Sequence, residues 1–294
     1  MKQIAFLTSS NVVNPDPAHH DAHREFRVEL NVLQQACLTV GFNMIPCIWD
    51  APDFDPAAFD VVMVGTCWDY MEKTDAFLQM LDRCDRESRL LNPVKTLRWN
   101  SRKTYMQDLA AKSAPIIPTV WAEQADEATI EGAFDTLRAD DIVVKPIVGG
   151  GAWRQARIRR GETMPHTNLL PPDDCMIQPF LPSVSDEGEY TFLFFDRKFS
   201  HCALKRPAAG DYRVQSEYGG SEVAHIPSRQ ELALASSVVE CIEGDLLYAR
   251  VDMLRGLDGQ LALIEIELIE PYLYPEQGPD MGASFAAALK RLTP

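Results

Sequence analysis

The chain has 294 residues, of which 46% are hydrophobic and 24% charged, values typical of a globular protein of roughly two or three compact units. Its formal net charge of −15 at pH 7 argues against nucleic acid or an anionic membrane surface as the main partner. No stretch approaches the roughly 20 consecutive apolar residues of a membrane helix, and MKQIAFLTSS leads directly into polar residues, so a cytoplasmic protein is expected.

The first part of the chain alternates strand and helix patterns. Strands are predicted at 3–9, 43–50 and 60–70, and helices at 23–41 and 73–87, the first of them closed by Gly41. This alternation indicates a small parallel α/β sheet, and a sheet of that kind binds ligands at the carboxyl ends of its strands.

Trp68, Asp69 and Tyr70 follow the third strand and therefore lie at this binding edge. One hypothesis is that they select the amino group of a substrate. The alternative is that Trp68 and Tyr70 pack against the next domain while Asp69 caps the following helix.

The middle of the chain begins with a proline-marked link at Pro93. A helix is expected to start near Asn100 or Ser101 and to end before Pro115, which places a domain boundary near residue 95. DDIVVKPIVGGGAWRQARIRR then predicts a strand, a glycine-rich loop and a second strand, and CMIQPFLPSVSDEGEYTFLFFDRKF predicts a strand, a bend and a long strand. We divide the chain into domains 1–95, 96–184 and 185–294.

The glycine-rich loop is a candidate phosphate site, because Lys145 ends a β-branched run and Gly149, Gly150 and Gly151 follow. Glycines let the backbone approach an anion, and lysine supplies a point charge. The alternative is a hairpin loop with a surface lysine, and neither the Walker A pattern nor G-x-G-x-x-G is present.

The linker after 175–178 raises a similar choice. Its backbone N–H and C=O groups could meet an adenine edge, with Glu189 accepting the ribose hydroxyls. It could also be a proline-braced bend.

A β-hairpin is predicted for LLYARVDMLRGLDGQLALIEIELIE, because Asp258-Gly259 lies between apolar runs. A two-residue turn puts Asp252 opposite Glu265, and strand alternation then gathers these two acids with Glu267 on one face. The other face would hold Ile264, Ile266 and Leu268. The prediction requires an even loop, since a three-residue loop would reverse the faces.

Three carboxylates on one face repel one another unless a cation lies among them. Oxygen ligands of this kind suit Mg²⁺ bridging substrate phosphates. The alternative is a solvated face balanced by Arg250, which would lie opposite Glu267. In an unbroken strand Glu270, just before Pro271, would point to the other face.

The cysteines and the histidines say less about function. The seven cysteines are scattered, odd in number and without a C-x-x-C pair, so we expect small core residues rather than disulfides or a zinc site. His19, His20 and His23 could form a transition-metal site, but a solvated polar loop is the more ordinary interpretation.

Taken in order, LLNP…RWNSRKTYMQDL, VVKP, QPFLPS…EGEYTF, SHCALKRPAAGDYRVQ and LYARVDML…IEIELIEP resemble the ATP-grasp superfamily over nearly the whole chain. The branch is that of glutathione synthetases, and the chain is most similar to the cyclo-ligases that close O-ureido-serine in cycloserine biosynthesis. The resemblance implies an α/β ATP-grasp fold. Residues 1–95 would form a pre-ATP-grasp substrate domain, 96–184 the central subdomain and 185–294 the C-terminal subdomain.

The resemblance also implies ATP and two Mg²⁺ ions, with Mn²⁺ as a substitute. The ATP-binding residues would be Lys103, Lys145, Gly149, Gly150, Gly151, Gln178, Pro179, Phe180, Leu181 and Glu189. The metal ligands would be Asp252, Glu265 and Glu267, although many members have Asn at the last position. Arg206 would stabilise an acyl phosphate, Arg213 would bind the acceptor or the phosphate, and Lys205 completes this catalytic group. Substrate contacts would come from Trp68, Asp69 and Glu270.

The implied activity is an ADP-forming ligation or cyclisation of a small amino-acid-derived substrate through an acyl phosphate. One alternative is a ligase that modifies a peptide or protein terminus, which would need a basic docking surface that the charge of −15 disfavours. Another is a nucleotide-binding sensor without chemistry, which has no need of three clustered acids. A homo-oligomer is left open.

Overall fold

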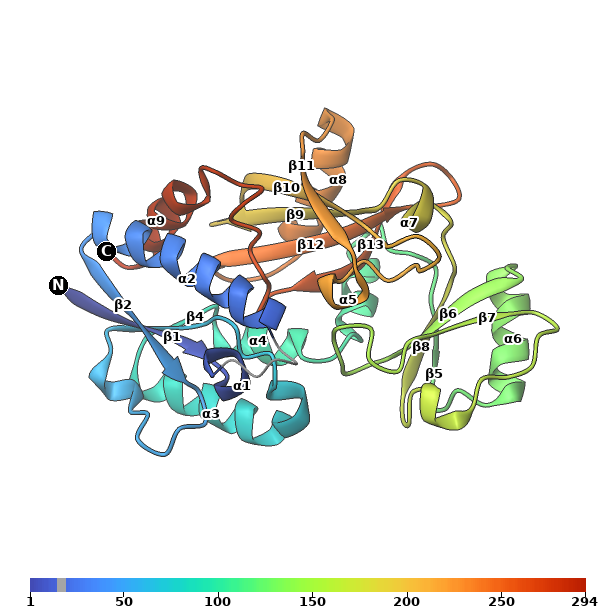
Figure 1. Ribbon diagram of the computed structural model, residues 1–294, viewed down its shortest axis with the longest axis horizontal. Coiled ribbons are helices and arrows are strands. Elements are labelled where there is room, and N and C mark those ends of the chain that lie inside the picture. Colours follow the sequence, from blue (N-terminus) through green and yellow to red (C-terminus); the bar gives the residue numbers. More distant parts are fainter. Residues whose placement is uncertain (15–19) are drawn as a thin grey trace.

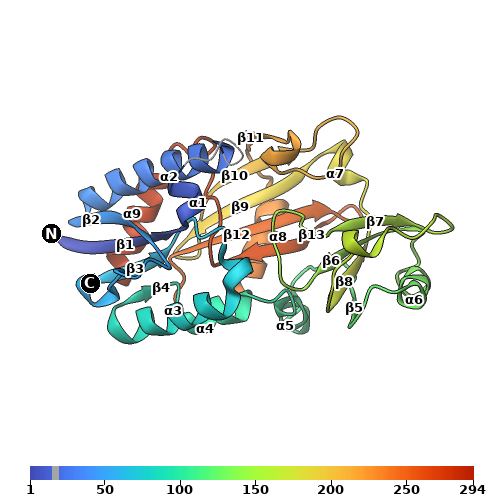
Figure 2. The ribbon, with the colours of Figure 1, turned by 60° about the horizontal axis from the view of Figure 1, so that its bottom comes forward.

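The structure, a computed structural model, describes residues 1–14 and 20–294. Within these ranges no helix has the length and apolar character needed to cross a membrane. Three sheets follow one another along the long axis: a parallel sheet at one end, a large antiparallel sheet in the middle and a small antiparallel sheet at the other end (Figures 1 and 2). The predicted mixed α/β architecture is confirmed, and all seven cysteines are free.

The parallel sheet is built as predicted from the N-terminal alternation. Its strands are ordered β2 (Phe42–Ile48), β1 (Lys2–Thr8), β3 (Val61–Val64) and β4 (Leu90–Leu91). The long helix α2 (His20–Thr39) ends just before Gly41, whose φ of +86° is the left-handed conformation that glycine adopts readily. Helices α3 (Thr74–Glu87) and α4 (Val94–Asn100) pack on the face opposite α2. Short helices occur at α1 (Ser10–Val13), η2 (Pro56–Ala58) and η3 (Tyr70–Lys73).

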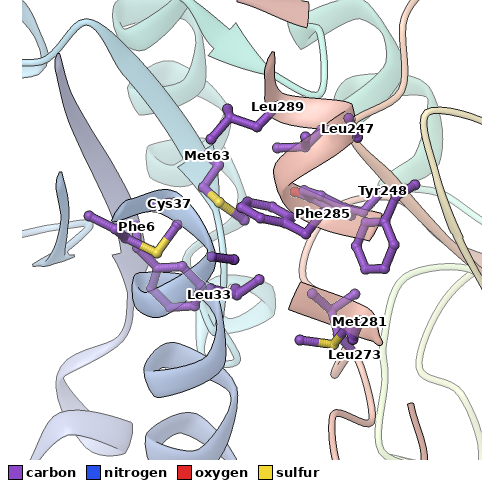
Figure 3. Close-up of a cluster of buried hydrophobic side chains, with 14 of the residues drawn as sticks. Phe6, Leu33, Cys37, Met63, Leu247, Tyr248, Leu273, Met281, Phe285 and Leu289 are labelled. Carbon is purple, nitrogen blue, oxygen red and sulfur yellow. The ribbon is translucent and has the colours of Figure 1, made fainter. Parts of the chain in front are cut away.

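The C-terminal helix α9 (Met281–Leu292), for which no element was predicted, returns to this sheet and packs beside α2. Figure 3 shows Phe285 and Leu289 of α9 in one apolar cluster with Phe6 of β1 and Leu33 of α2. The burial of these side chains joins the two ends of the chain.

The small sheet has the order β5 (Val120–Ala122), β8 (Cys175–Pro179), β6 (Asp141–Pro146) and β7 (Ala156–Arg159), with α6 (Glu127–Leu137) packed on it. A 3-10 turn, η4 (Thr167–Leu169), precedes β8. The predicted strand, loop and strand around the glycines are confirmed as β6 and β7.

The helix predicted between residues 100 and 115 is present as α5 (Tyr105–Ala111), but it starts later than the predicted cap at Asn100 or Ser101. A helix that was not predicted, α4, precedes it and starts directly after Pro93. Proline favours a helix start because it lacks an N–H and has a fixed φ. The proposed boundary at 95 therefore falls in α4, and the one at 184 falls in α7 (Ser183–Asp186).

The central sheet has the order β11 (Ser221–His225), β10 (Lys198–Arg206), β9 (Glu189–Phe195), β12 (Tyr248–Arg255) and β13 (Leu261–Glu267). A 3-10 turn, η5 (Ser216–Tyr218), precedes β11. Helix α8 (Arg229–Glu240) packs on the sheet and begins with a capping box between Ser228 and Glu231.

The hairpin of β12 and β13 pairs Asp252 with Glu265 and Arg250 with Glu267, as predicted. The turn differs, because residues 257–259 form a three-residue loop in which the Gly256 N–H donates to the Gln260 C=O at 2.7 Å. This odd loop shifts the register by one residue, and a β-bulge at Ile264 shifts it back. The predicted two-residue turn is wrong, and the predicted pairing holds only because of the bulge.

The bulge also moves Ile264. It was predicted to lie with Ile266 and Leu268, but it joins the apolar cluster of Phe180 and Leu254, while Ile266 and Leu268 pack in the main core. Ile264 therefore shares a face with Glu265, its neighbour in sequence.

Candidate active site

A cavity of about 560 Å³ runs between the central and small sheets and reaches the parallel sheet. One end is lined by β6, β8 and the glycine-rich loop. The other is lined by α1, α2 and the segment after β13, including Tyr272. The acid face of the hairpin lies between these ends.

The acids of the hairpin are each matched by a protein cation. Asp252 is 2% exposed and accepts hydrogen bonds from Thr191 Oγ1 at 2.7 Å and from Arg250 Nη2 at 2.9 Å. Glu265 Oε1 lies 2.7 Å from Lys103 Nζ, and Glu267 forms an ion pair with Arg250. Burial raises the pKa of Glu267 to about 7.

In this arrangement the three acids do not form a metal site by themselves. Within the described ranges, no group of three or more His, Cys, Asp or Glu side chains is placed to hold a metal ion. The donor set is nevertheless oxygen-only, which fits a hard cation that brings phosphate oxygens as further ligands. Lys103 and Arg250 are the cations paired with these carboxylates.

The two predicted phosphate lysines lie close to the glycine-rich loop or to the linker. Lys103 Nζ donates to the Gly149 C=O at 2.6 Å. Lys145 Nζ donates to Gln178 Oε1 at 3.1 Å, and burial lowers the pKa of Lys145. Gly149, Gly150 and Gly151 line the cavity, and the φ values of Gly149 (+147°) and Gly151 (+56°) fall in the region that favours glycine.

The linker from Gln178 to Leu181 borders an apolar slot. Gln178 is buried and donates from Nε2 to Thr119 Oγ1 at 3.0 Å, and the Phe180 N–H donates to the Asp141 C=O at 2.8 Å. The slot lies between the small sheet and the hairpin, and its apolar cluster comprises Ile117, Val143, Phe180, Leu181, Val184, Val214, Leu254 and Ile264. Pro179 lines the cavity at the same place.

The basic residues of β10 and the loop after it are divided between inside and outside. Lys205 is buried, lines the cavity, pairs with Glu189 and lies 3.6 Å from Asp252. Arg206, the next residue, is exposed and donates from Nε to the Glu187 C=O, outside the cavity lining. Successive strand residues point to opposite faces, so only one of the two can reach the site.

Arg213 lines the cavity but is already engaged. Its Nη2 lies 2.6 Å from Asp211 Oδ2, and its guanidinium lies 3.7 Å from the ring centre of Tyr218. A ligand would have to compete with both contacts.

Of the three predicted substrate contacts, Trp68 and Glu270 line the cavity. Trp68 Nε1 donates to the Glu270 C=O at 3.0 Å. The structure does not bring Asp69 to the cavity lining: this residue accepts from Trp49 Nε1 at 2.7 Å and makes no side-chain cap to η3. Tyr70 packs on Phe77, with ring centres 4.7 Å apart.

Glu270 was expected on the opposite face of an unbroken strand. Strand β13 ends at Glu267, so alternation no longer applies and Glu270 joins the other acids at the cavity. Burial, together with Glu267 and Glu265, raises the pKa of Glu270.

Arg250 is the main residue that the site prediction lacked, since it was considered only as a counter-charge. It is 8% exposed, lines the cavity, contacts Asp252 and Glu267, and donates to the Tyr272 C=O at 3.4 Å. Its position two residues before Asp252 on the same strand was the available signal.

Most of the predicted histidine site lies in residues that the structure does not describe. His19 and the side chain of His20 lie outside the described part of the chain. His23 Nδ1 lies 2.8 Å from the Val12 carbonyl oxygen, to which it donates.

Residues 4–92 match the N-terminal domain family of the D-cycloserine synthetase DcsG. Over 278 residues the chain is 32% identical to the cycloserine biosynthesis protein DcsG of Streptomyces lavendulae, covering 89% of this chain and 93% of that protein. The chain belongs to the DcsG family of ATP-grasp ligases.

Other relatives agree with this assignment. A glutathione synthetase of Ralstonia nicotianae is 23% identical over 266 residues, covering 85% of this chain and 72% of that protein. The crystal structure of D-cycloserine synthetase DcsG matches with a TM-score of 0.85 and 26% identity, over 99% of this chain and 100% of that one. D-alanine–D-alanine ligase from Bacillus anthracis shares the fold, with a TM-score of 0.68 and 14% identity over 98% and 95% of the two chains. The predicted superfamily, fold and ligase class are confirmed.

Proposed function

We propose that this DcsG-family ligase activates the carboxylate of a small amino-acid-derived substrate with ATP and then closes a ring within the same molecule, with O-ureido-serine as the substrate in cycloserine biosynthesis. The observation that carries the proposal is the arrangement along one cavity: an apolar slot, two lysines beside a glycine-rich loop, and three acids interleaved with Arg250 and Lys205.

The adenine of ATP would fill the apolar slot beside Gln178, Pro179, Phe180 and Leu181. Because the Phe180 N–H is already bonded to Asp141, the backbone of Pro179 and Leu181 is left to meet the adenine edge. Glu189 would accept the ribose hydroxyls, and Lys103, Lys145 and the N–H groups of residues 149–151 would hold the phosphates.

Asp252, Glu265 and Glu267 would hold two Mg²⁺ ions, for which Mn²⁺ can substitute. Bound there, the ions would neutralise charge on the phosphate oxygens during transfer. Arg250 and Lys205 would lose their acid partners to the ions and turn to the transferring oxygens. We assign to these two residues the charge-stabilising role that the resemblance implied for Arg206.

The reaction has two steps. A substrate carboxylate oxygen bonds to the γ-phosphorus as the bond to the leaving ADP oxygen breaks, which gives an acyl phosphate. A nitrogen of the same molecule then bonds to the acyl carbon, loses a proton and displaces phosphate. The residues of this chain act by positioning and by matching charge.

The test is a screen for ADP release over amino acids, dipeptides and O-ureido-serine, with mass spectrometry of the product. We expect Mg²⁺-dependent ADP release with O-ureido-serine and a cyclic product. Release with peptides alone would favour the ligase of peptide termini. ATP binding without release for any acceptor would favour the sensor.

Two minor proposals accompany this one. The free cysteines support a cytosolic location, because the cytosol keeps thiols reduced. The boundaries near 95 and 184 are retained as the proposed limits of the three domains.

A further inference from the structure

Three buried side-chain oxygens in the described part of the chain have no hydrogen-bond partner: Asn11 Oδ1, Gln215 Oε1 and the Tyr272 hydroxyl. All three residues line the same cavity. Buried polar atoms without partners are uncommon and costly, by about 1–3 kcal/mol each. Because all three surround one cavity, they point to a polar ligand that would donate hydrogen bonds to them.

Glu25 of α2 connects the segments that carry these oxygens. Its Oε1 accepts from Ser216 Oγ, next to Gln215, at 3.2 Å. Glu25 lines the cavity, as does Asn11 on the preceding helix α1, which packs against α2. Burial raises the pKa of the Tyr272 phenol, and the charges of Glu29 and then Glu25 raise it further. The acid and the three oxygens therefore belong to one end of the cavity.

The segment that carries Tyr272 is held in place by side chains that hydrogen-bond to its backbone. The Leu273 N–H donates to Glu29 at 2.7 Å, the Leu273 C=O accepts from His201 Nε2 at 2.9 Å, and the Tyr272 C=O accepts from Arg250. Tyr272 is 8% exposed, and its ring packs edge-on to Trp68 with centres 6.5 Å apart. The hydroxyl is thus fixed without a ligand.

The acids at this end have no ion-pair partner among the described residues: Glu25 forms no ion pair with any of them, and Glu222 lines the same cavity. Burial raises the pKa of Glu25 to about 7. An ammonium group carries three N–H donors and no acceptor, which equals the number of oxygens without a partner, and its positive charge suits the neighbouring acid.

We propose that Glu25, Tyr272, Asn11 and Gln215 form a subsite for the α-ammonium group of the substrate, which restricts the ligase to amino-acid derivatives with a free amine. The inference rests on the proposed ligase function of the cavity and extends it to the class of substrate. The competing occupant is the NH₂ group of a ureido tail, and the experiment separates the two.

Binding is measured by calorimetry with ADP and Mg²⁺ present, so that no turnover is required. The probes are O-ureido-serine, its des-amino analogue 3-(ureidooxy)propanoate, serine and 3-hydroxypropanoate. The proteins are wild type, Glu25→Gln and Tyr272→Phe, with Glu276→Gln as the control. Glu276 lies on the surface in an ion pair with Arg24 and outside the cavity lining.

We expect wild type to bind each amino compound at least about tenfold more tightly than its des-amino partner, because a charged hydrogen bond contributes about that factor. Glu25→Gln should weaken O-ureido-serine and serine about tenfold and leave both des-amino compounds unchanged. Tyr272→Phe should act in the same direction by about threefold. Glu276→Gln should change nothing.

The subsite is wrong if wild type binds amino and des-amino compounds equally, if it binds neither amino compound, or if Glu25→Gln weakens only the two ureido compounds. The proposed ring closure fails separately. Ammonium-dependent binding without ADP release from O-ureido-serine would retain the subsite and overturn the cyclisation. Turnover of O-ureido-serine with no ammonium preference would do the reverse.

Discussion

At the hairpin, each predicted metal ligand already meets a protein cation, whereas at the α2 end Glu25 forms no ion pair with a described residue. Both groups line one cavity. Burial raises the pKa of Glu267 at the hairpin and of Glu25 at the α2 end alike to about 7, so the two ends differ in the partners of their acids and not in the pKa values.

This difference indicates what each end expects from a ligand. In the proposed function, the ligand at the hairpin would supply both signs: metal for the acids and phosphate for Lys103 and Arg250. In the proposed ammonium subsite, the ligand would supply positive charge and N–H donors. The two ends of the cavity would then select a nucleotide and an amino acid through the charged and hydrogen-bonding partners that each end lacks.

The largest effect should follow Glu265→Gln. This change keeps the shape of a half-exposed side chain and removes a proposed metal ligand, so we expect kcat for ADP release to fall by roughly 10²–10³-fold with the fold intact. The measurement is coupled ADP release, with circular dichroism for the fold. Glu243→Gln, on an exposed side chain, is the matched control. Retained turnover in Glu265→Gln would contradict the assignment of Glu265 as a metal ligand.

Arg250→Met should rank second and tests the choice between Arg250 and Arg206. Removing Arg250 leaves Glu267 buried without its cation and leaves Asp252 with only the more distant Lys205, which we expect to cost about 3–5 kcal/mol in urea unfolding. Arg250→Lys keeps a charge but not the fork that spans two carboxylates, so it should fold and still lose about tenfold or more in kcat. Arg206→Met, on an exposed side chain, should change both quantities little. A larger kcat loss for Arg206→Met than for Arg250→Lys would restore Arg206 as the catalytic residue.

The third prediction concerns Glu29, which supports the α2 end through the Leu273 N–H. Burial raises the pKa of Glu29 to about 8, above its ordinary value of 4.5. Between these values the folded chain keeps a proton that the unfolded chain releases, so this stabilisation is full below about pH 4.5 and is lost as pH rises through about 8.

Glu29→Gln should remove this pH dependence. Relative to the variant, wild type should lose stability on the order of 4 kcal/mol between about pH 5 and pH 9, as measured by urea unfolding at each pH. Glu276→Gln serves again as control and should follow wild type. If Glu29→Gln and wild type have parallel profiles, Glu29 is ionised in the fold.

Patterns local to one hairpin or one strand were predictable from the sequence. The β6–loop–β7 unit and the pairing of Asp252 with Glu265 follow from alternation and turn residues. The pairing was reached with the wrong turn, because neither the three-residue loop nor the bulge at Ile264 has a signal that alternation can detect. Two errors of one residue cancelled.

The predictions that were wrong or missing concern which face of a strand points inward, or contacts between residues far apart in the sequence. Strand alternation predicts that Lys205 and Arg206 point to opposite faces, but not which of them points inward. The register shift between Phe199 and His201 means that the inward face cannot be inferred from the residues earlier in the strand. The α2 end joins Asn11 and Glu25 to Gln215 and Tyr272, which are far apart in the sequence and line one cavity only in the folded chain. No local pattern encodes that contact.

The smallest effect should come from a position remote from both ends of the cavity. Ser228 caps α8 by accepting from the Glu231 N–H, and Ser228→Ala should lower the free energy of unfolding by about 1 kcal/mol. Ser237→Ala, within the same helix, removes a hydroxyl that bonds only to the Leu234 C=O, and should be nearly neutral because alanine favours the helix. Neither variant should change the KM for ATP or for the amino substrate, since neither residue lines the cavity. A shift in either KM would mean that the hairpin end and the α2 end of the cavity are coupled through the central sheet and respond to its stability. The difference between the two ends could then not be explained by local charge alone.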